Sequence, residues 1–587
     1  MTSLAAQRDA RAASDAGRGD AATPGLPSGL PARLLARAGA THARACAALV
    51  LLCLACYLPG LASLQPMDRD EPRFAQATKQ MLETGDLVDI RFQGEARHKK
   101  PVGIYWLQAA AVAAGDALGV PDARRTIWLY RLPSLAGAIA AVLLVYWTAL
   151  AFLDRGRALL AAGLLGTSVL LVVEAHLAKT DAVLAACAAA AMGALARAWL
   201  GRGKPGSGRP LPSATVAVFW LGLAVGVLVK GPMVPFFVAL PALALSWRAG
   251  SGRWLLPLRP LAGLAFVLLV CAPWFAAIAL RSGGAFFAEA VGHDMLGKVG
   301  TAQTQHWAPP GTYALVTVAT FWPASVLALL AIPFAWRHRR EDAVAFLLAW
   351  AVPAWIVLEC VPTKLPHYVL PLLPALAILA CLALARGDVH PRRPGSRAVA
   401  LLWPALPAAL AVGLCVAALR LDGAVPWAAL PTLALAVLLA AVAWRGFAAG
   451  RVAGAPVLAL LAAALVGPAV LGLAAPVLAS LRLSPRLAAL RAAAPCPAPA
   501  TASLGYREPS LVFLAGTDLA LLEGGAAGAA FLAEGGCRVV FVESRQEPDF
   551  REAAARAGLA PRLLGRAAGL NINGGRRLDV AAYGTAP

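Results

Sequence analysis

The chain has 587 residues, of which 59% are hydrophobic and only 14% are charged, and its mean hydropathy is +0.68. Soluble domains carry about 25% charged residues, so the composition excludes an ordinary soluble globular protein. The formal net charge of +21 would suit a nucleic-acid-binding protein, but in a membrane protein it reflects arginines gathered in cytoplasmic loops. No basic stretch is interleaved with aromatic residues on a soluble module, so we expect no nucleic acid among the partners.

Residues 1–42 are rich in Ala, Arg, Gly and Pro and have no apolar face, which predicts a disordered cytoplasmic arm. Thirteen apolar spans follow, each typical of a membrane helix. They lie near 43–64, 131–153, 158–175, 182–200, 214–229, 233–247, 260–280, 312–336, 343–361, 367–385, 399–419, 426–444 and 455–478. The sequence therefore predicts an all-α membrane domain over residues 43–481.

The basic residues of the loops indicate how these helices are oriented. With the amino terminus in the cytoplasm, the six inner loops hold 17 Lys or Arg, whereas the five short outer loops hold 5. Cytoplasmic loops of membrane proteins carry such an excess. Because the number of spans is odd, we expect both the long first loop, 65–130, and the tail, 482–587, in the periplasm.

Nearly all the unusual polar residues share the outer side of this topology. They are Asp68, Asp70, Glu71, Lys99, Lys100, Lys179, Asp181, Lys230, His293, Asp294, His306, Lys364 and His367. Ionisable residues so close to hydrocarbon are costly and usually functional. We expect them to converge on one cavity at the outer face of the membrane.

Three of these residues, Asp68, Asp70 and Glu71, form an acidic cluster directly after the first span. The apolar residues that follow, from Phe74 to Leu82, recur at three- and four-residue spacing, which predicts a helix along the membrane surface. Carboxylates at a helix amino terminus are favoured by the dipole, so a capping role is one explanation. Three acids together, followed by Arg73, also favour a functional site.

Other candidate residues mark the outer ends of later spans. Lys100 precedes Tyr105 and Trp106, where it either anchors the chain at the membrane interface or binds a phosphate. His293, Asp294 and His306 are metal-ligating residue types, but their spacing matches no standard ligand pattern. The segment 363–368 again places a cation, Lys364, beside a histidine, His367, and a tyrosine, Tyr368.

The sequence pattern of the tail differs from that of the rest of the chain. Residues 510–514, 538–543 and 578–584 are predicted as strands, and 519–534 and 550–558 as helices between them. A small α/β domain over 482–587 fits this pattern, with a role in packing and specificity. Cys496 and Cys537 are its two cysteines, and a disulfide between them suits a periplasmic location.

The outer cavity would be rich in Lys and Arg, with a few carboxylates at its centre. Cations at membrane level suit a lipid phosphate, and the carboxylates suit either a general base or a divalent metal ion. This chemistry is expected of glycosyl transfer from a polyprenyl-phosphate sugar. The competing hypothesis is a transporter or lipid flippase, which usually shows internal repeats and ionisable groups near the bilayer midplane. The sequence has no clear repeat, and its charged residues cluster at one face.

An ordered set of motifs over about residues 65–385 resembles the bacterial membrane glycosyltransferases related to 4-amino-4-deoxy-L-arabinose lipid A transferase. More distantly, it is similar to dolichyl-phosphate-mannose-protein mannosyltransferases. The matching motifs are Asp70-Glu71-Pro72-Arg73-Phe74, Lys100-Pro101 before Tyr105-Trp106, Tyr130-Arg131-Leu132-Pro133, Lys179-Thr180-Asp181, Lys230-Gly231-Pro232, Ala272-Pro273-Trp274-Phe275 and Thr363-Lys364-Leu365-Pro366-His367-Tyr368.

The resemblance implies a GT-C type fold with about 13 transmembrane helices, periplasmic surface helices in the first loop and a small C-terminal α/β domain. It implies an inverting transfer in the bacterial inner membrane, with the active site facing the periplasm. The donor would be a sugar on undecaprenyl or a similar polyprenyl phosphate, and the acceptor lipid A, core oligosaccharide or another envelope molecule. Asp70 matches the family's essential first-loop acid, and Asp181 its second acid.

These matches give the expected site. We expect Asp70, Glu71 and Asp181 to act in catalysis, and Arg73, Lys100, Lys179, Lys230, Lys364, His367 and Tyr368 to bind substrate. In the arabinose transferases a glutamate commonly precedes the lysine of the Lys-Pro pair, whereas this chain has Lys99 there. The resemblance therefore carries over neither a metal site nor the identity of the sugar.

Overall fold

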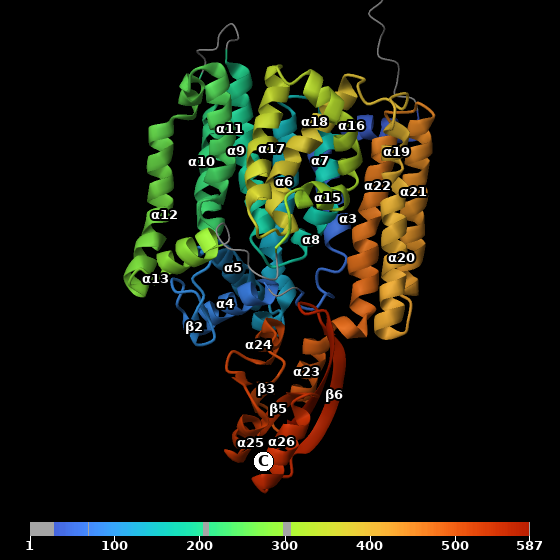
Figure 1. Cartoon of the computed structure of the whole chain (residues 1–587). Helices are drawn as coiled ribbons and strands as arrows, with labels where there is room; N and C mark the ends of the chain where they lie inside the picture. The colour runs from blue at the N-terminus through green and yellow to red at the C-terminus, as the bar shows by residue number, and fades with distance from the viewer. Residues whose placement is uncertain (1–28, 68–69, 203–209, 298–306, 586–587) are drawn as a thin grey trace, which may run out of the picture.

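The apolar spans of the sequence form a bundle of helices, and a small sheet domain is attached to one end of it (Figure 1). The structure, a computed structural model, describes residues 29–67, 70–202, 210–297 and 307–585. We call the end that carries the sheet domain the lower face and the opposite end the upper face, as they lie in Figure 1. The expected membrane all-α architecture with a small α/β domain is confirmed.

Within the described ranges, nine helical segments are long and apolar enough to cross a membrane. They are α6 (Ile127–Ala149), α9 (Asp181–Gly201), α10 (Ser213–Lys230), α12 (Pro260–Ser282), α17 (Asp342–Cys360), η4 with α18 (Pro366–Ala385), α19 with α20 (Ser396–Asp422), η5 with α21 (Trp427–Ala448) and α22 with its extension (Ala455–Val477). Two pairs are sharply bent: α2 (Leu30–Ala38) with α3 (His42–Tyr57), by 114°, and α7 (Arg155–Gly166) with α8 (Val169–Ala175), by 63°.

Three shorter helices complete the bundle: α11 (Met233–Ala249), α15 (Thr312–Thr320) and α16 (Ala324–Arg337). Each of the thirteen predicted apolar spans falls on one of these helices or on a bent or broken pair. The span predicted at 312–336 is divided between α15 and α16, because Pro323, which lacks an amide hydrogen, lies at the break.

The predicted amino-terminal arm is helical near its end. Residues 1–28 lie outside the described part of the chain, but Leu30–Ala38 form α2. Pro31 stands in the first turn, where its missing amide hydrogen costs nothing, and Ala32 is buried. The disorder expected for 30–38 is therefore wrong, because this short helix packs on α7 and α22.

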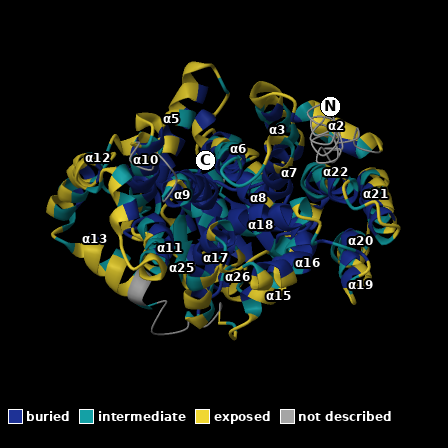
Figure 2. Ribbon diagram, turned by 90° about the horizontal axis from the view of Figure 1, so that it is seen from above, coloured by how far each residue is buried: buried dark blue, intermediate teal, exposed yellow. Residues whose placement is uncertain are grey.

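Buried residues concentrate on the central helices α6, α9 and α18, whereas α12, α20 and α21 lie at the edge with exposed apolar faces (Figure 2). Small residues let the central helices approach closely. A Cβ atom added to Gly137 of α6 would lie 2.8 Å from the backbone nitrogen of Val183 in α9. Close backbone contact of this kind is typical of helix packing in membranes.

The first loop forms the lower face of the bundle. It contains α4 (Asp70–Thr84), the hairpin of β1 (Arg91–Phe92) and β2 (Glu95–Ala96), α5 (Gly103–Ala117) and η1 (Ala123–Arg125). The helix predicted from the apolar spacing is confirmed as α4, with Phe74, Ala77 and Met81 buried. Farther along, α13 (Ala285–Phe287) and the π-helix η3 (Ala288–Leu296) lie at the same level (Figure 1).

The tail forms a five-stranded mixed sheet in the order β4-β3-β5-β7-β6. The strands are β3 (Ala500–Leu504), β4 (Ala520–Leu522), β5 (Arg538–Glu543), β6 (Arg562–Asn571) and β7 (Arg576–Gly584). Helices α23 (Leu483–Ala492) and α24 (Pro509–Ala515) pack on one face, and α25 (Gly525–Ala533) and α26 (Glu547–Arg556) on the other. A disulfide joins Cys496 to Cys537, whose Cα atoms are 6.4 Å apart.

The strand predicted at 510–514 is wrong, because this segment is the helix α24. Its residues Leu511, Val512 and Phe513 are all buried, since the helix is covered by the sheet on one side and by α4 on the other. A continuous apolar run fits a buried strand and a buried helix equally well. Pro509 in the first turn is the signal that favours the helix.

Candidate active site

Glu71 and Arg131 form a buried ion pair beneath the bundle, and neither side chain is exposed. Arg131 Nε donates to Glu71 Oε1 over 2.7 Å, and its Nη2 donates to Oε2 over 3.0 Å. The carboxylate also accepts hydrogen bonds from the backbone amides of Met67 and Ala178, at 2.6 and 3.0 Å. Glu71 therefore ties α4 to α6 and to the turn before α9, and it faces protein on every side.

Asp70 and Arg73 lie on the first turn of the same helix, but their side chains reach solvent. The side chain of Asp70 is 45% exposed, and its Oδ1 lies 3.9 Å from Nη1 of Arg73. The carboxylate thus stands at the amino-terminal end of α4, where the helix dipole favours its charge. Since Glu71 on the next position is anchored inside, Asp70 is held at the surface of the lower face.

The helices α8, α9, α10 and η4 bring a second group of ionisable residues together. Asp181 is the first residue of α9, and Lys230 is the last residue of α10. Lys230 Nζ donates to Asp181 Oδ1 over 2.5 Å. The turn that follows needs Gly231, whose φ of 59° is unfavourable for residues with a side chain. Both side chains are almost wholly buried, so the pair is shielded from water.

His367, from η4, lies between two carboxylates of this group. Its Nε2 is 3.9 Å from Asp181 Oδ1, and its Nδ1 is 3.7 Å from Glu174 Oε1. Lys179 Nζ lies 3.5 Å from the same Glu174 oxygen. We call Glu174, Lys179, Asp181, Lys230 and His367 the central cluster. It combines two carboxylates, two lysines and an imidazole within the lower ends of the membrane helices.

Tyr368 connects the central cluster to the rest of the lower face. Lys230 Nζ lies 5.5 Å from the centre of its ring. The tyrosine is also within electrostatic reach of Asp181, Asp294 and Asp70, which belong to α9, η3 and α4. Tyr105 of α5 senses the same Asp70 and Asp294, and burial raises the pKa of its hydroxyl. Asp70, Asp181 and Asp294 therefore lie in the same region as these two tyrosines, while a single shared cavity stays a prediction.

Lys100 meets the lower face from the loop before α5. Its Nζ forms a short ion pair with the carboxylate of Asp294 in η3. The Lys100 side chain is 22% exposed, so this cation stands at the rim of the site and not in its interior. Asp294, which the sequence suggested as a member of the outer cavity and as a metal ligand, thus brings a carboxylate to a predicted phosphate-binding lysine.

Lys364 is held differently from the other predicted cations. Its Nζ donates to the backbone oxygens of Glu359 and Val361, at 2.8 and 2.6 Å, where α17 ends. It also lies 5.7 Å from the ring centre of Tyr313. A lysine in this place satisfies carbonyl groups that a helix end leaves without partners. Its contacts are those of a helix cap, and they do not join it to the central cluster.

The carboxylates of this site, as far as the structure describes them, do not form a set of ligands for a divalent metal ion. No group of three or more His, Cys, Asp or Glu suited to a metal occurs in the described ranges. The carboxylates of Asp181 and Asp294 each face a lysine ammonium, which competes with a cation for the same oxygens. His293 is exposed, and His306 lies outside the described residues.

The sheet domain holds α4 from below. Gln76 Nε2 donates to Thr517 Oγ1 over 2.8 Å, and the buried Lys79 donates to the carbonyl of Phe513 over 3.2 Å. Burial lowers the pKa of Lys79, while Glu83 at 3.7 Å opposes this effect. The domain is therefore in direct contact with the helix that carries Asp70.

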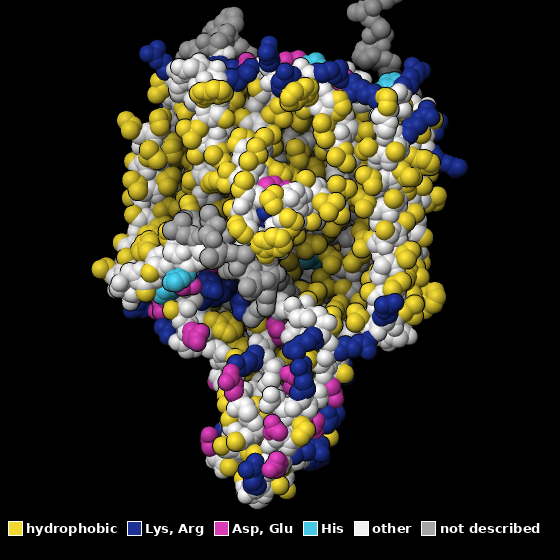
Figure 3. Space-filling view, in the orientation of Figure 1, with side chains coloured by type: hydrophobic (Ala, Val, Ile, Leu, Met, Phe, Trp, Pro, Cys, Tyr) yellow, Lys and Arg dark blue, Asp and Glu magenta, His cyan; other side chains and the backbone are white. Residues whose placement is uncertain are grey.

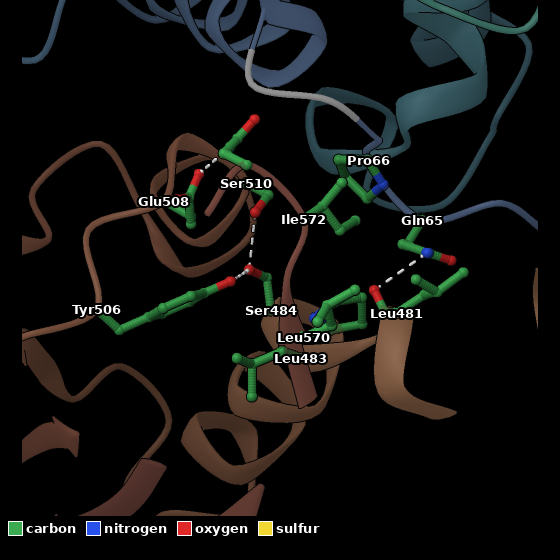
Figure 4. A pocket seen from close by; sticks show the side chains of 12 residues that line it. Gln65, Pro66, Leu481, Leu483, Ser484, Tyr506, Glu508, Ser510, Leu570 and Ile572 are labelled. Carbon is green, nitrogen blue, oxygen red and sulfur yellow. Dashed lines mark hydrogen bonds between the residues drawn. The ribbon is translucent and has the colours of Figure 1, made fainter. Parts of the chain in front are cut away.

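A small cavity of about 20 Å³ marks a second junction between the first loop and this domain (Figure 4). Its wall includes Gln65 and a chain of hydroxyls in which Ser484 contacts both Tyr506 and Ser510 at 2.8 Å. Gln65 donates to the carbonyl of Leu481 over 3.1 Å. This volume has room for only about one water molecule. The cavity is therefore part of the domain junction and not a substrate-binding site.

Several of the residues that build the site were not predicted in these roles. Arg131 stood in a matching motif without a role, yet it fixes Glu71. Glu174 and Asp294 complete the contacts of Lys179, His367 and Lys100. The signal for Glu174 was its charge beside an apolar span, which is costly unless the charge is paired.

The chain resembles known membrane transferases in sequence and in fold. The family model described as dolichyl-phosphate-mannose-protein mannosyltransferase matches residues 99–276. An undecaprenyl phosphate-alpha-4-amino-4-deoxy-L-arabinose arabinosyl transferase from Edwardsiella ictaluri is 30% identical over 342 residues, which cover 55% of each chain. The protein of the same name from Pseudomonas aeruginosa is 32% identical over 320 residues, covering 53% of this chain and 54% of its own.

The family resemblance is confirmed. The chain spans about half the length of the arabinosyl transferases that it matches. The crystal structure of ArnT from Cupriavidus metallidurans bound to undecaprenyl phosphate superposes with a TM-score of 0.69, covering 91% of this chain and 97% of that one. The same protein in the apo state gives a TM-score of 0.65. At 19% and 18% sequence identity, these two matches establish that the chain shares the fold of ArnT, and the apolar helices of its described residues indicate a multi-pass membrane protein.

Proposed function

We propose that the chain is an inverting glycosyltransferase that moves a sugar from a polyprenyl-phosphate donor to lipid A or another envelope acceptor. The observation that carries the proposal is the central cluster, a buried set of paired cations and carboxylates at the lower ends of the membrane helices. The similarity to arabinosyl transferases supports the reaction class. The donor is a sugar on undecaprenyl or a similar polyprenyl phosphate.

The cations near the lower face bind the donor phosphate in this proposal. Lys100 and Arg73 are partly exposed there, and each faces a carboxylate that a phosphate could replace. Lys230 and Lys179 lie deeper, in the central cluster. In the reaction the bond between the sugar C1 and the phosphate oxygen breaks, and these cations stabilise the negative charge that stays on the departing polyprenyl phosphate.

Asp70 acts at the acceptor side. Its carboxylate is 45% exposed and is held by the anchored helix α4, so an acceptor oxygen can reach it. If the acceptor is a phosphate of lipid A, that oxygen is already ionised near neutral pH, and Asp70 orients it. If the acceptor is a sugar hydroxyl, Asp70 takes its proton as a general base. Attack opposite the leaving phosphate inverts the sugar C1.

The remaining predicted residues take supporting roles. Asp181 binds Lys230, and the ring of Tyr368 lies beside the same lysine. His367 lies 3.9 Å from Asp181 and positions that carboxylate. The geometry favours a positioning role for Glu71 in place of the expected catalytic one, because all of its contacts are inside the protein. Lys364 likewise positions η4 by capping α17.

The lower face lies in the periplasm and the bundle in the bacterial inner membrane. The six loops predicted to be cytoplasmic hold 17 Lys or Arg, an excess typical of that side, and Figure 3 shows a rim of Lys and Arg at the upper end of the bundle. The disulfide between Cys496 and Cys537 in the lower domain agrees with this orientation, because disulfides persist in oxidising compartments.

An assay with the full-length protein in detergent tests the proposal. The protein is mixed with lipid A and undecaprenyl-phosphate sugars, a pentosamine, a hexuronic acid and a hexose in turn, and products are identified by mass spectrometry. We expect one sugar to be transferred, with release of undecaprenyl phosphate. Lys230→Gln and Asp181→Asn should each lower the rate at least tenfold.

The matched control is Asp116→Asn, which removes an exposed carboxylate from α5 of the same face. This variant should keep the wild-type rate. Transfer at the wild-type rate by both cluster variants would refute the proposed site. Translocation of a lipid-linked sugar across vesicles without any transfer would instead support the transporter hypothesis.

A further inference from the structure

A groove opens on the membrane side of the bundle, far from the residues of the proposed reaction. It has a volume of about 530 Å³ and is lined by α16, α17 and α18. Helices α16 and α17 each pack on α18 but have almost no contact with each other, so α18 forms the floor. Small side chains, Ala328, Ala335 and Ala349, leave the space open. Ligand pockets in proteins span about 300–1,000 Å³.

The groove is apolar along its length and cationic at one end. Its walls include Ile332, Val352 and Leu376, whereas Arg339 lines the end nearest the upper face. Beside it stands Trp336, which is 68% exposed, and the Arg339 guanidinium lies 4.4 Å from the centre of its ring. Tryptophan is enriched where membrane helices meet the lipid head groups.

The neighbouring carboxylates are already paired with other cations. Glu341 binds Arg386 at 2.7 Å, and Asp388 binds Arg337 and Arg393 at 2.5 Å. Among the described residues no carboxylate lies within ion-pair distance of Arg339, which donates to the carbonyl of Trp336. Figure 3 shows the wider setting, an apolar belt bounded above by a rim of Lys and Arg. The charge of Arg339 is thus available to an anion at the mouth of the groove.

We propose that this groove binds one anionic glycerophospholipid from the leaflet at the upper face. An acyl chain lies between α16 and α17, and the phosphate head group contacts Arg339 beside Trp336. Basic pockets between membrane helices recognise anionic head groups in this way. The site differs from the donor site, because it lies at the opposite end of the helices and contains none of the residues assigned to transfer. It does not depend on the proposed function.

Native mass spectrometry of the full-length protein tests this inference. Delipidated protein is mixed with equal amounts of dioleoylphosphatidylglycerol and dioleoylphosphatidylcholine, and the retained lipid is counted as detergent is removed. We expect one retained phosphatidylglycerol, preferred over phosphatidylcholine by about fivefold, the size expected for one arginine near a charged head group. The variant Arg339→Gln should lose this preference.

Two further variants separate the site from the general lipid annulus. Ala349→Leu narrows the groove and should reduce retention of both lipids, whereas Arg253→Gln removes an exposed arginine of the same face and should change nothing. A melting temperature close to that of the wild type shows that each variant is folded. Equal retention of the two lipids by the wild type, or equal behaviour of Arg339→Gln and Arg253→Gln, would overturn the proposal.

Discussion

The carboxylate of Glu71 and the guanidinium of Arg131 face each other through two hydrogen bonds, and neither side chain has any exposed surface. Arg131 also donates to the carbonyls of Leu61, Leu64 and Gln65, at 2.8 to 2.9 Å. The pair therefore joins α6 to the end of the first span and to the start of α4. This junction fixes where Asp70 stands relative to the membrane helices.

Breaking this pair should destabilise the protein strongly. Glu71→Gln leaves the Arg131 charge buried without its carboxylate, which costs about 3–5 kcal/mol in other proteins. Arg131→Gln should cost at least as much, because three backbone carbonyls lose their donor as well. The temperature at which half of the purified protein unfolds in detergent, followed by size-exclusion chromatography, measures both effects.

An exposed ion pair of the same loop is the control for this experiment. Arg125 and Asp122 are 3.7 Å apart, with side chains 41% and 63% exposed. Arg125→Gln should cost less than about 1 kcal/mol, as solvent-exposed pairs usually do. If Glu71→Gln shifted the unfolding temperature no more than Arg125→Gln, the anchoring role would be wrong.

Asp294 should compete with the donor phosphate for Lys100. Removing its charge in Asp294→Asn releases Lys100 and takes away a repelling carboxylate, so the apparent KM for the polyprenyl-phosphate donor should fall severalfold. Lys100→Gln should raise the apparent KM for the same donor. Steady-state kinetics at varied donor concentration give both values.

A nearby acid of the same segment serves as reference. Glu289→Gln alters a carboxylate of η3 that forms no ion pair with any described residue, and the KM should stay at the wild-type value. A rise in KM for Asp294→Asn that matched the rise for Lys100→Gln would contradict the competition. It would indicate that Asp294 holds Lys100 in place for the donor.

The sheet domain should lose stability in acid through Glu547. Burial of this carboxylate opposes its ionisation, but hydrogen bonds from Arg566 and Tyr583 outweigh burial and lower its pKa to about 2. A carboxyl group with a lowered pKa in the folded state stabilises the fold above its unfolded pKa of about 4.5 and loses this contribution as the pH falls towards 2.

The domain should therefore become more sensitive to pepsin between pH 4.5 and 2, relative to an unfolded reference peptide. Since Arg566 is 38% exposed, screening reduces the contribution of Glu547 to about 2 kcal/mol. Glu547→Gln should be sensitive already at pH 4.5, with a flatter pH profile. Glu552→Gln, on the same helix but 71% exposed, should behave like the wild type. A wild-type pH profile for Glu547→Gln would contradict the proposed role of Glu547 in stability.

The helices and their order could be predicted from the sequence, because apolar spans and apolar spacing are local signals. The helix α4 was predicted from the spacing of Phe74, Ala77 and Met81, and its first turn carries the predicted acids. Asp181, Lys230 and His367 were expected to lie near one another, because they share one side of the membrane, but their pairing was not predicted. Their distances depend on how α9, α10 and η4 pack.

Partners that come from distant elements could not be predicted. Glu71 and Asp70 are neighbours with the same chemistry, and only the position of Arg131, 60 residues away, separates their roles. Lys364 and Lys230 look alike in sequence, yet one meets helix carbonyls and the other a carboxylate. The apolar run of α24 fits a buried strand equally well, and apart from Pro509 only its neighbours, the sheet and α4, distinguish it.

Mass spectrometry of lipid A and core oligosaccharide tests the central claim of glycosyl transfer most directly. Cells that lack the protein are compared with cells that carry the wild type or Asp70→Asn, with Asp122→Asn as an exposed-acid control. The wild type and the control should both restore one sugar mass to an envelope glycolipid, while Asp70→Asn, expressed at the same level, should not. Full restoration by Asp70→Asn would contradict the proposed role of Asp70. An envelope whose glycans are the same with and without the protein would contradict the transferase.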